Sequence, residues 1–438
     1  MDNQESVAGS TVGRPGNLNI KILLGIVALA LACKLIVFWL SVGTSMGLSL
    51  PNAENWQDYG LAYVPAVDAF RSGFLPYVSF YYPYPPLFLY ALTAFSYLPL
   101  PSWSSALPLV AADALTVIPV YLIARELVSE QRALMISILF VLAPTNLYYV
   151  DYLWLNPSLT TLFLMTSIYF LIKRHYGLSA LALALSIGFK QTALLALPVV
   201  LLVMWGVGVR RREPLKYLLL VASICLLFSL PYIVVSPTLY LDSVFRVPFG
   251  LWPTQVPQNY FQIGVGAGTL VTFDTSNWIT SMWQLVASGI NSPVTLALPV
   301  FIFLIPSAYS WIYNSSYVTD VLWLGLLGGY AYLMYVMRKK PSIDRSDSLN
   351  YVLYALLLLF AFYPLYKYYA IGLIPIFVLL VRSKKGAVGF VGFNLVFLLM
   401  PRYLASWVLL VAFVWLLRRP LVRRMKARPR SSVELQPA

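Results

Sequence analysis

Two isolated acids have the residue type and position for catalysis. Asp58 lies in a long aromatic loop after the first apolar segment, where a carboxylate has the chemistry of a general base toward a hydroxyl nucleophile. Asp151 is the sole acid between Glu130 and Glu213, and we expect it at the outer membrane edge. Acids at that level commonly serve a ligand, an ion or a partner. The alternative for Asp151 is an interfacial acid that caps the next helix near Asn156.

Two further acids have weaker claims. Asp68 follows Asp58 in the same loop, and a solvated loop acid is its expected role. Asp113 lies in the middle of an apolar run, where an ionisable side chain is a functional candidate by default. A structural hydrogen bond inside a helix bundle explains Asp113 equally well.

Lys190 and Lys367 are isolated bases between apolar segments, expected on the outer side. Outer loops normally carry few basic residues, so both need an explanation. A phosphate fits Lys190, held by the ammonium and by a helix N-terminus that begins at Gln191. The alternative is a lysine whose ammonium reaches past its apolar stem to water. Lys367 lies in an aromatic cluster with Tyr368, and Arg246 supplies a third cation from a second outer loop.

Membrane helices must position these residues. Of the 438 residues, 60% are hydrophobic and 11% are charged. Apolar windows of about 18–22 residues recur along the chain, and lipid forces such segments into helices. The predicted fold class is an all-α polytopic membrane protein of about 12–14 transmembrane helices. Its two long extracytosolic loops, 43–104 and 236–293, carry short helices.

Basic residues define the orientation and the domain limits. They gather at span ends and in the C-terminal tail, so the net charge of +14 indicates positive-inside topology and attraction to membrane lipids, and no nucleic-acid binding. We expect a disordered cytosolic lead at 1–19, one transmembrane domain at 20–418 and a basic cytosolic tail at 419–438. The protein is predicted to be multi-pass, in the plasma membrane or the endoplasmic reticulum according to the organism.

Two apolar segments do not fit this orientation as crossings. Residues 86–98 are too short to span and are predicted to form a helix on the outer face. If 294–313 crosses, part of 258–291 must cross with it. The spans expected after the first, at 20–42, are 105–125, 132–149, 157–173, 177–189, 191–209, 215–235, 318–338, 349–365, 368–382, 387–401 and 403–418.

Several site types are disfavoured. No His, Cys or Asp grouping has the spacing of zinc ligands, and there is no Gly-rich nucleotide loop. Cys33 and Cys225 both lie in predicted spans, so no disulfide framework is indicated. A cytosolic nucleotide site is therefore not expected, and any energy source or group donor for a reaction must be of another kind.

The order of the motifs is characteristic. Asp58 is followed by Gly73, Pro76-Tyr77 and Tyr84-Pro85-Pro86, then by a cytosolic Ala124-Arg125-Glu126-Leu127, an outer Asp151, and Lys190 ahead of Pro198. This order resembles the GT-C superfamily of integral-membrane glycosyltransferases, and particularly the polyprenyl-phosphate-mannose-type enzymes, over about residues 20–235.

The resemblance implies a role for each matched residue. Asp58 deprotonates or orients the acceptor, and Asp151 is the second outer acid. Many relatives hold an acidic pair there. With a single Asp, a divalent metal is one possibility that the sequence does not decide, and no cofactor is assigned. Lys190 and Lys367 contact the lipid phosphate. Arg246, Tyr84 and Tyr368 complete the substrate-binding set.

The resemblance also implies the reaction. A hexose, mannose or glucose, moves with inversion from a polyprenyl- or dolichyl-phosphate donor to a lipid-linked glycan, glycolipid or protein. The alternative from another class is a membrane transporter or lipid flippase, whose signs are repeats, broken helices and midplane charges. The unusual residues here gather at one face, which favours the enzyme, and Asp113 is the feature that favours transport.

Overall fold

The computed structural model describes residues 19–42, 59–80, 82–241, 243–244, 293–294, 316–338, 350–352, 355–356, 365–366, 371–381 and 383–399. Four of the predicted site residues, Asp58, Arg246, Lys367 and Tyr368, lie outside this set. So do the predicted lead up to residue 18, the span at 403–418 and the basic tail.

Helices make up nearly all of the described structure. The only strands in that part of the chain, β1 (Pro293–Val294) and β2 (Leu365–Tyr366), form one short antiparallel pair. The α-helices are α1 (Ile20–Val42), α2 (Val64–Arg71), α3 (Pro86–Ser96), α4 (Leu107–Leu115), α5 (Val117–Leu127), α6 (Glu130–Val141), α7 (Pro144–Asn146), α8 (Pro157–Ile172), α9 (Tyr176–Phe189), α10 (Ala196–Gly206), α11 (Arg212–Val235), α12 (Pro237–Leu241), α16 (Ser316–Arg338), α18 (Ile374–Leu379) and α19 (Lys384–Leu399).

Four helical segments are long and apolar enough to cross a membrane: Ile20–Val42, Ser102–Leu127, Glu130–Tyr152 and Arg212–Val235. They coincide with the spans predicted at 20–42, 105–125, 132–149 and 215–235, and the predicted polytopic helical class is confirmed. The segment predicted to be too short to cross forms the 11-residue helix α3.

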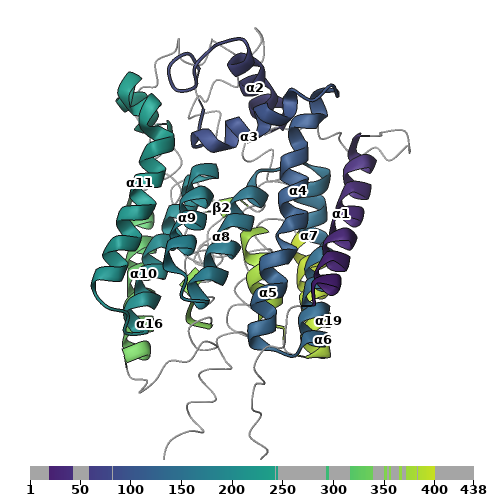
Figure 1. Cartoon of the computed structure of the whole chain (residues 1–438), viewed down its shortest axis with the longest axis vertical. Coiled ribbons are helices and arrows are strands. Elements are labelled where there is room, and N and C mark those ends of the chain that lie inside the picture. Colours follow the sequence, from purple (N-terminus) through teal and green to yellow (C-terminus); the bar gives the residue numbers. More distant parts are fainter. Residues whose placement is uncertain are drawn as a thin grey trace, which may run out of the picture.

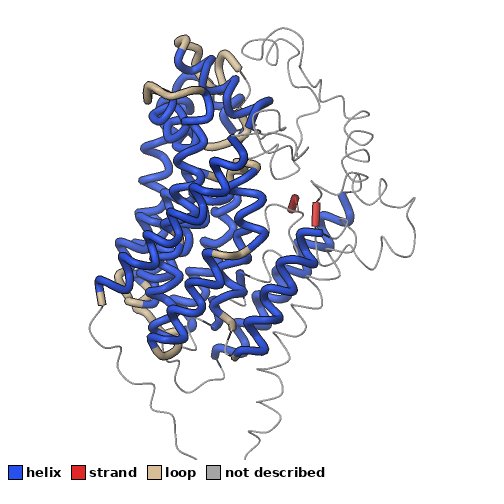
Figure 2. The backbone as a smooth tube through the Cα atoms, turned by 90° about the vertical axis from the view of Figure 1, so that its right-hand side faces the viewer, coloured by secondary structure: helices blue, strands red, loops and turns tan. Residues whose placement is uncertain are grey.

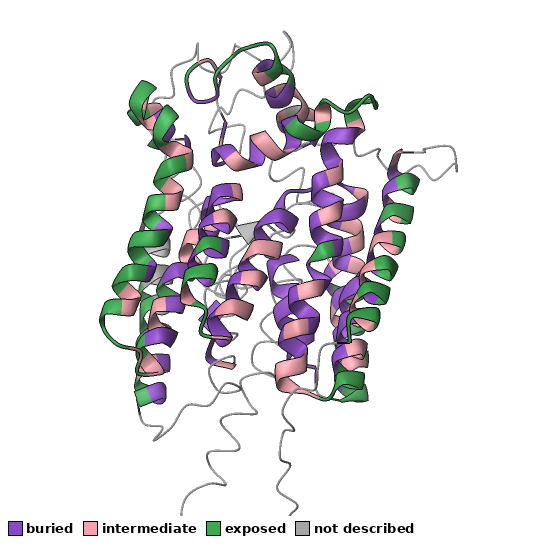
Figure 3. Cartoon of the chain, viewed as in Figure 1, coloured by how far each residue is buried: buried purple, intermediate pink, exposed green. Residues whose placement is uncertain are grey.

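The long helices run beside one another as a bundle, and α2 and α3 lie across one end (Figure 1). The side view shows the same bundle, with connections at both of its ends (Figure 2). Helices α1 and α11 flank the bundle and expose apolar side chains along their outer faces, whereas the helices between them are largely buried (Figure 3). Exposed leucines on flanking helices suit contact with lipid, which is as apolar as they are.

One face of α1 attaches this helix to the bundle. Its buried residues are Ile26, Ala30, Lys34, Phe38 and Ser41, which recur every three or four positions and so line a single stripe. The stripe places a lysine and a serine inside the protein, in a helix that is otherwise apolar except for the exposed Lys21 near its start. The serine hydroxyl donates a 2.6 Å hydrogen bond to the carbonyl oxygen of Tyr152.

Helices α8 and α9 pack closely and antiparallel through small residues. The Ser167 and Ser179 hydroxyls each donate to the other residue's carbonyl oxygen at 2.9 Å. Two turns farther along, the Ser186 hydroxyl donates to the Thr160 carbonyl oxygen at 2.8 Å. Small polar residues of this kind allow close helix approach in membranes. In this register the start of α8 lies level with the end of α9, where Lys190 follows.

Candidate functional site

The end of the bundle under α3 holds two of the predicted substrate-binding residues together. Lys190 follows α9 in an extended conformation and is only 4% exposed. Its ammonium lies 5.7 Å from the centroid of the Tyr84 ring, close enough for a cation–π contact. The next residue, Gln191, donates from its side-chain amide to the Pro83 carbonyl oxygen at 2.8 Å. The lysine is therefore fixed against the Tyr-Pro-Pro motif.

The helix predicted to begin at Gln191 starts differently. Residues Gln191–Leu195 form a five-residue 3₁₀ turn, and the α-helix begins only at Ala196. A turn of that length does not provide the aligned peptide dipoles of an α-helix N-terminus. The long helix whose N-terminus lies level with Lys190 is α8.

The Pro-Tyr and Tyr-Pro-Pro motifs have a structural explanation. Gly73 has φ 89°, a conformation that glycine adopts without strain, and it ends α2. Tyr77 also has a positive φ, 63°, and its hydroxyl donates to the carbonyl oxygen of Tyr84. Burial raises the pKa of Tyr77 well above its ordinary value, so the phenol stays protonated and remains a donor. The hydrogen bond thus ties the loop to the residue that covers Lys190.

Aromatic rings fill the space beneath this loop. Tyr84 packs edge-on against Tyr63 at 5.8 Å, Tyr82 at 5.6 Å and Phe88 at 5.2 Å between ring centroids. Edge-on aromatic pairs of this geometry hold one another in orientation. The Tyr82 hydroxyl is buried and has no hydrogen-bond partner among the residues described. Lys190 therefore faces a rigid aromatic wall.

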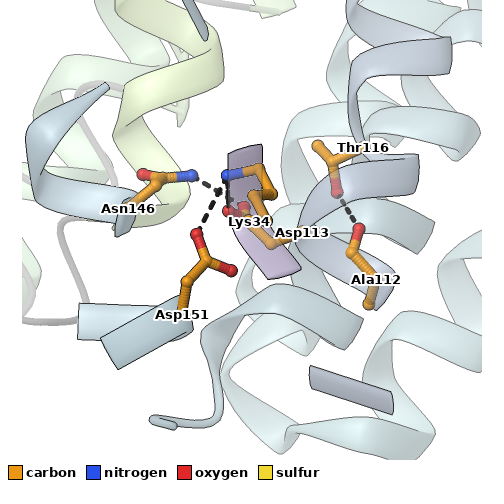
Figure 4. A network of polar contacts seen from close by, with 6 residues as sticks. All are labelled: Lys34, Ala112, Asp113, Thr116, Asn146 and Asp151. Carbon is orange, nitrogen blue, oxygen red and sulfur yellow. Dashed lines mark hydrogen bonds and ion pairs between the residues drawn. The ribbon is translucent and has the colours of Figure 1, made fainter. Parts of the chain in front are cut away.

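Asp151 lies in a second cluster, shown in Figure 4. The residue belongs to a π-helical turn over Leu147–Tyr152 and is fully buried. Its carboxylate lies 3.2 Å from the ammonium of Lys34 on α1, which also pairs with Asp113 on α4. The side-chain amide of Asn146 donates to the other oxygen of Asp113 at 2.8 Å. Lys34 therefore joins three parts of the chain.

This network favours the structural one of the two roles considered for Asp113. The carboxylate has two partners from two other helices, as expected for a structural group in a bundle. The intramembrane acid is thereby accounted for without a transport pathway. Near the acid, the Thr116 hydroxyl donates to the Ala112 carbonyl oxygen at 2.7 Å, at the junction of α4 and α5 (Figure 4).

Lys34 and Asn146 were not predicted from the sequence. A lysine in an apolar span has the same appearance whether it faces lipid, a partner or a water-filled path. One signal was present: Lys34 and Ser41 are seven residues apart and therefore share a helix face, which indicates a buried polar stripe. No comparable pattern singles out Asn146.

Asp151 has one oxygen without a partner in the described part of the chain, namely Oδ1. The other oxygen is held by Lys34 and the side chain is 0% exposed, so the contacts of Asp151 are those of a buried structural group, and its catalytic role stays a prediction. Within the same residues, no group of three or more His, Cys, Asp and Glu side chains could hold a metal ion.

Comparisons with known proteins agree with the motif order. The model of the ALG3 protein family matches residues 83–248, a segment that includes Tyr84, Asp113, Asp151 and Lys190. No curated protein matches the sequence. The match covers less than half of the chain; over that segment it confirms the predicted resemblance to GT-C membrane glycosyltransferases. The four apolar spans confirm the predicted integral-membrane localisation.

Two solved structures align with most of this chain at low identity. The apo oligosaccharyltransferase of Archaeoglobus fulgidus is 13% identical, with a TM-score of 0.44 over 88% of this chain. The chain spans 56% of the length of that protein. ArnT from Cupriavidus metallidurans bound to undecaprenyl phosphate is 15% identical, with a TM-score of 0.45, over 91% of this chain and 78% of that chain.

Proposed function

We propose that this membrane glycosyltransferase moves a hexose from a polyprenyl- or dolichyl-phosphate donor to a lipid-linked glycan, glycolipid or protein on the extracytosolic face. The observation that carries the proposal is the buried ammonium of Lys190 against the Tyr84 ring, at the end of the bundle that α2 and α3 cover. A fixed cation near the membrane face suits a lipid-linked phosphate. A donor with a lipid tail also explains why the enzyme lies in the bilayer and why its sequence has no cytosolic nucleotide loop.

In the proposed reaction, an acceptor hydroxyl oxygen attacks the anomeric carbon and forms the glycosidic bond. The bond between that carbon and the phosphate oxygen breaks, and its electron pair leaves with the lipid phosphate. Attack from the opposite face inverts the anomeric centre, through a state that resembles an oxocarbenium ion. Asp58 takes the hydroxyl proton, a contribution that is typically about 10²–10⁴-fold in rate.

The leaving phosphate needs positive charge rather than a general acid. Lys190 provides it, and Lys367 and Arg246 are proposed to add to it, with Tyr84 and Tyr368 as aromatic neighbours of the donor. Asp151 is proposed as the second acid of the site, and a divalent metal remains open. Its pairing with Lys34 makes a separate test of Asp151 necessary.

The test uses purified full-length protein in lipid, radiolabelled polyprenyl-phosphate mannose or glucose, and a membrane lipid extract as acceptor source. We expect sugar transfer by the natural chain and a loss of at least about 10²-fold in Asp58→Asn. The matched control is Asp68→Asn, an exposed acid of the same loop. Transfer by Asp58→Asn at the natural rate would refute the assignment of the base.

A second arm tests the transporter alternative. Sealed vesicles that contain the protein are given the labelled donor without acceptor. Suppose that the label crosses the bilayer in this assay and that no acceptor gives sugar transfer in the first assay. This result would favour a flippase and contradict the enzyme. Transfer with no such movement would support the enzyme.

A further inference from the structure

The first turn of α8 contains buried polar groups that the fold does not use. Both polar atoms of the Asn156 side chain and the hydroxyl of Ser158 have no hydrogen-bond partner among the residues described, and both residues are 0% exposed. Buried polar groups are almost always hydrogen-bonded, so a cluster of unused ones indicates a missing partner. Asn156 occupies the N-cap position, yet its side chain makes no capping bond.

These groups lie at the same level as Lys190. The carbonyl–hydroxyl contacts between α8 and α9 pair position 167 with 179 and position 160 with 186, so each pair advances by about two turns in opposite directions. One turn farther, the same antiparallel register sets Asn156 opposite Lys190. The stacked rings of Phe163 and Phe189, 5.4 Å apart, confirm that the end of α9 packs on the beginning of α8.

The chemistry of the combined groups selects an anion. The N-terminus of a 16-residue helix carries partial positive charge and peptide N–H groups that lack intrahelical acceptors. The Asn156 amide and the Ser158 hydroxyl add two neutral donors, and Lys190 adds a full positive charge. Phosphate oxygens accept from all of these, and helix N-termini bind phosphate for the same reason.

We propose that Asn156, Ser158 and the first turn of α8 form the second wall of a phosphate site whose first wall is Lys190, and that the site binds the phosphate monoester of a polyprenyl lipid. The proposal rests on the proposed function, because that function supplies the lipid phosphate. It goes beyond that function because it assigns phosphate recognition to the N-terminus of α8. The sequence predicts a helix N-terminus at Gln191 for this role.

The test measures binding of polyprenyl monophosphate, without sugar, to the full-length protein in detergent. In Asn156→Asp, a carboxylate replaces the amide at nearly the same volume. Asp caps helices as well as Asn and suits the helix dipole, and thermal unfolding of the same variant shows separately whether the buried carboxylate disturbs the fold. A phosphate site predicts at least about tenfold weaker binding, because two negative charges would then lie close together.

Three variants accompany it. Ser158→Ala should weaken binding about threefold to tenfold through the lost donor. Lys190→Met tests the first wall. Ser129→Asp is the matched control, since it makes the same charge change at the N-cap of α6, an exposed position.

The outcomes separate this proposal from the proposed function. Weaker binding in both Asn156→Asp and Lys190→Met, with Ser129→Asp unchanged, supports the proposal. Natural affinity in Asn156→Asp with weak binding in Lys190→Met overturns the α8 wall and leaves the proposed function standing. Natural affinity in both overturns both. Equal competition by phosphatidic acid, which has the same phosphate on a different tail, would overturn the assignment to a polyprenyl lipid.

Discussion

Replacing Lys34 with Met is expected to destabilise the protein strongly. Lys34 is fully buried and is the only cation in its cluster that the structure describes, while Asp113 and Asp151 contribute two carboxylates. Lys34→Met leaves both carboxylates without their cation inside the bundle. Removing one partner of a buried ion pair typically costs about 3–5 kcal/mol.

The structure predicts an asymmetry within the cluster. Asp151→Asn leaves one ammonium and one carboxylate, and the Asn side-chain oxygen can still accept from Lys34. We therefore expect Asp151→Asn to cost about 1 kcal/mol or less, the value of an ordinary hydrogen bond. The combined Lys34→Met/Asp113→Asn/Asp151→Asn variant removes all three charges and should recover much of the stability lost in Lys34→Met.

Thermal unfolding of the purified protein in detergent measures this order. If each kcal/mol lowers Tm by about 2 °C, as in larger domains, Lys34→Met should lower Tm by roughly 6–10 °C. Lys21→Met is the matched control, because Lys21 is an exposed residue near the start of the same helix. Sugar transfer by Asp151→Asn, measured on the same samples, separates a catalytic role from a structural one.

Two results would contradict this reasoning. A Tm for Lys34→Met within about 1 °C of that for Lys21→Met would mean that the cluster contributes no stability. A loss in Asp151→Asn as large as the loss in Lys34→Met would mean that the excess negative charge is itself needed for folding. If Asp151→Asn instead keeps its Tm and loses transfer, the predicted catalytic role of Asp151 is supported.

Three further predictions concern the wall that covers Lys190 and the helices beneath it. Gly188→Ala would place a Cβ 2.5 Å from Leu87 Cδ1 and should cost about 1–3 kcal/mol by thermal unfolding, partly recovered by Leu87→Ala in the same chain. Tyr84→Leu should weaken binding of polyprenyl monophosphate roughly threefold to tenfold, whereas Tyr84→Phe keeps the ring and the affinity, and equal affinities in the two variants would contradict the ring contact. Ser179→Ala should cost about 0.6 kcal/mol through its lost hydrogen bonds, and Ser179→Leu distinctly more because α8 and α9 could no longer approach.

The sequence predicts what depends on length and local pattern. The span at 20–42 is a 23-residue helix in which Lys21 and Lys34 are the only charged residues, and the helix at Pro86–Ser96 is recognisable because it is too short to cross. Tyr84 and Lys190 were each predicted as binding residues, but their contact depends on how α3 is laid over α9. Lys34 was missed because its partners lie 79 and 117 residues away in the sequence. Those partners decide which face of the largely apolar helix turns inward.

The ion cluster and the proposed phosphate site are joined by one short segment that packs against α1. Only five positions separate Asp151 from Asn156, and Trp154 between them has φ 56°, an unfavourable conformation for a bulky residue. Packing holds it there: the Trp154 ring lies 5.2 Å from Phe38 and 4.8 Å from Tyr59. Since α1 contacts this segment through Lys34 and Phe38 together, the first helix fixes where α8 begins. The residues that keep α1 in the bundle therefore also help to position the turn proposed to bind phosphate.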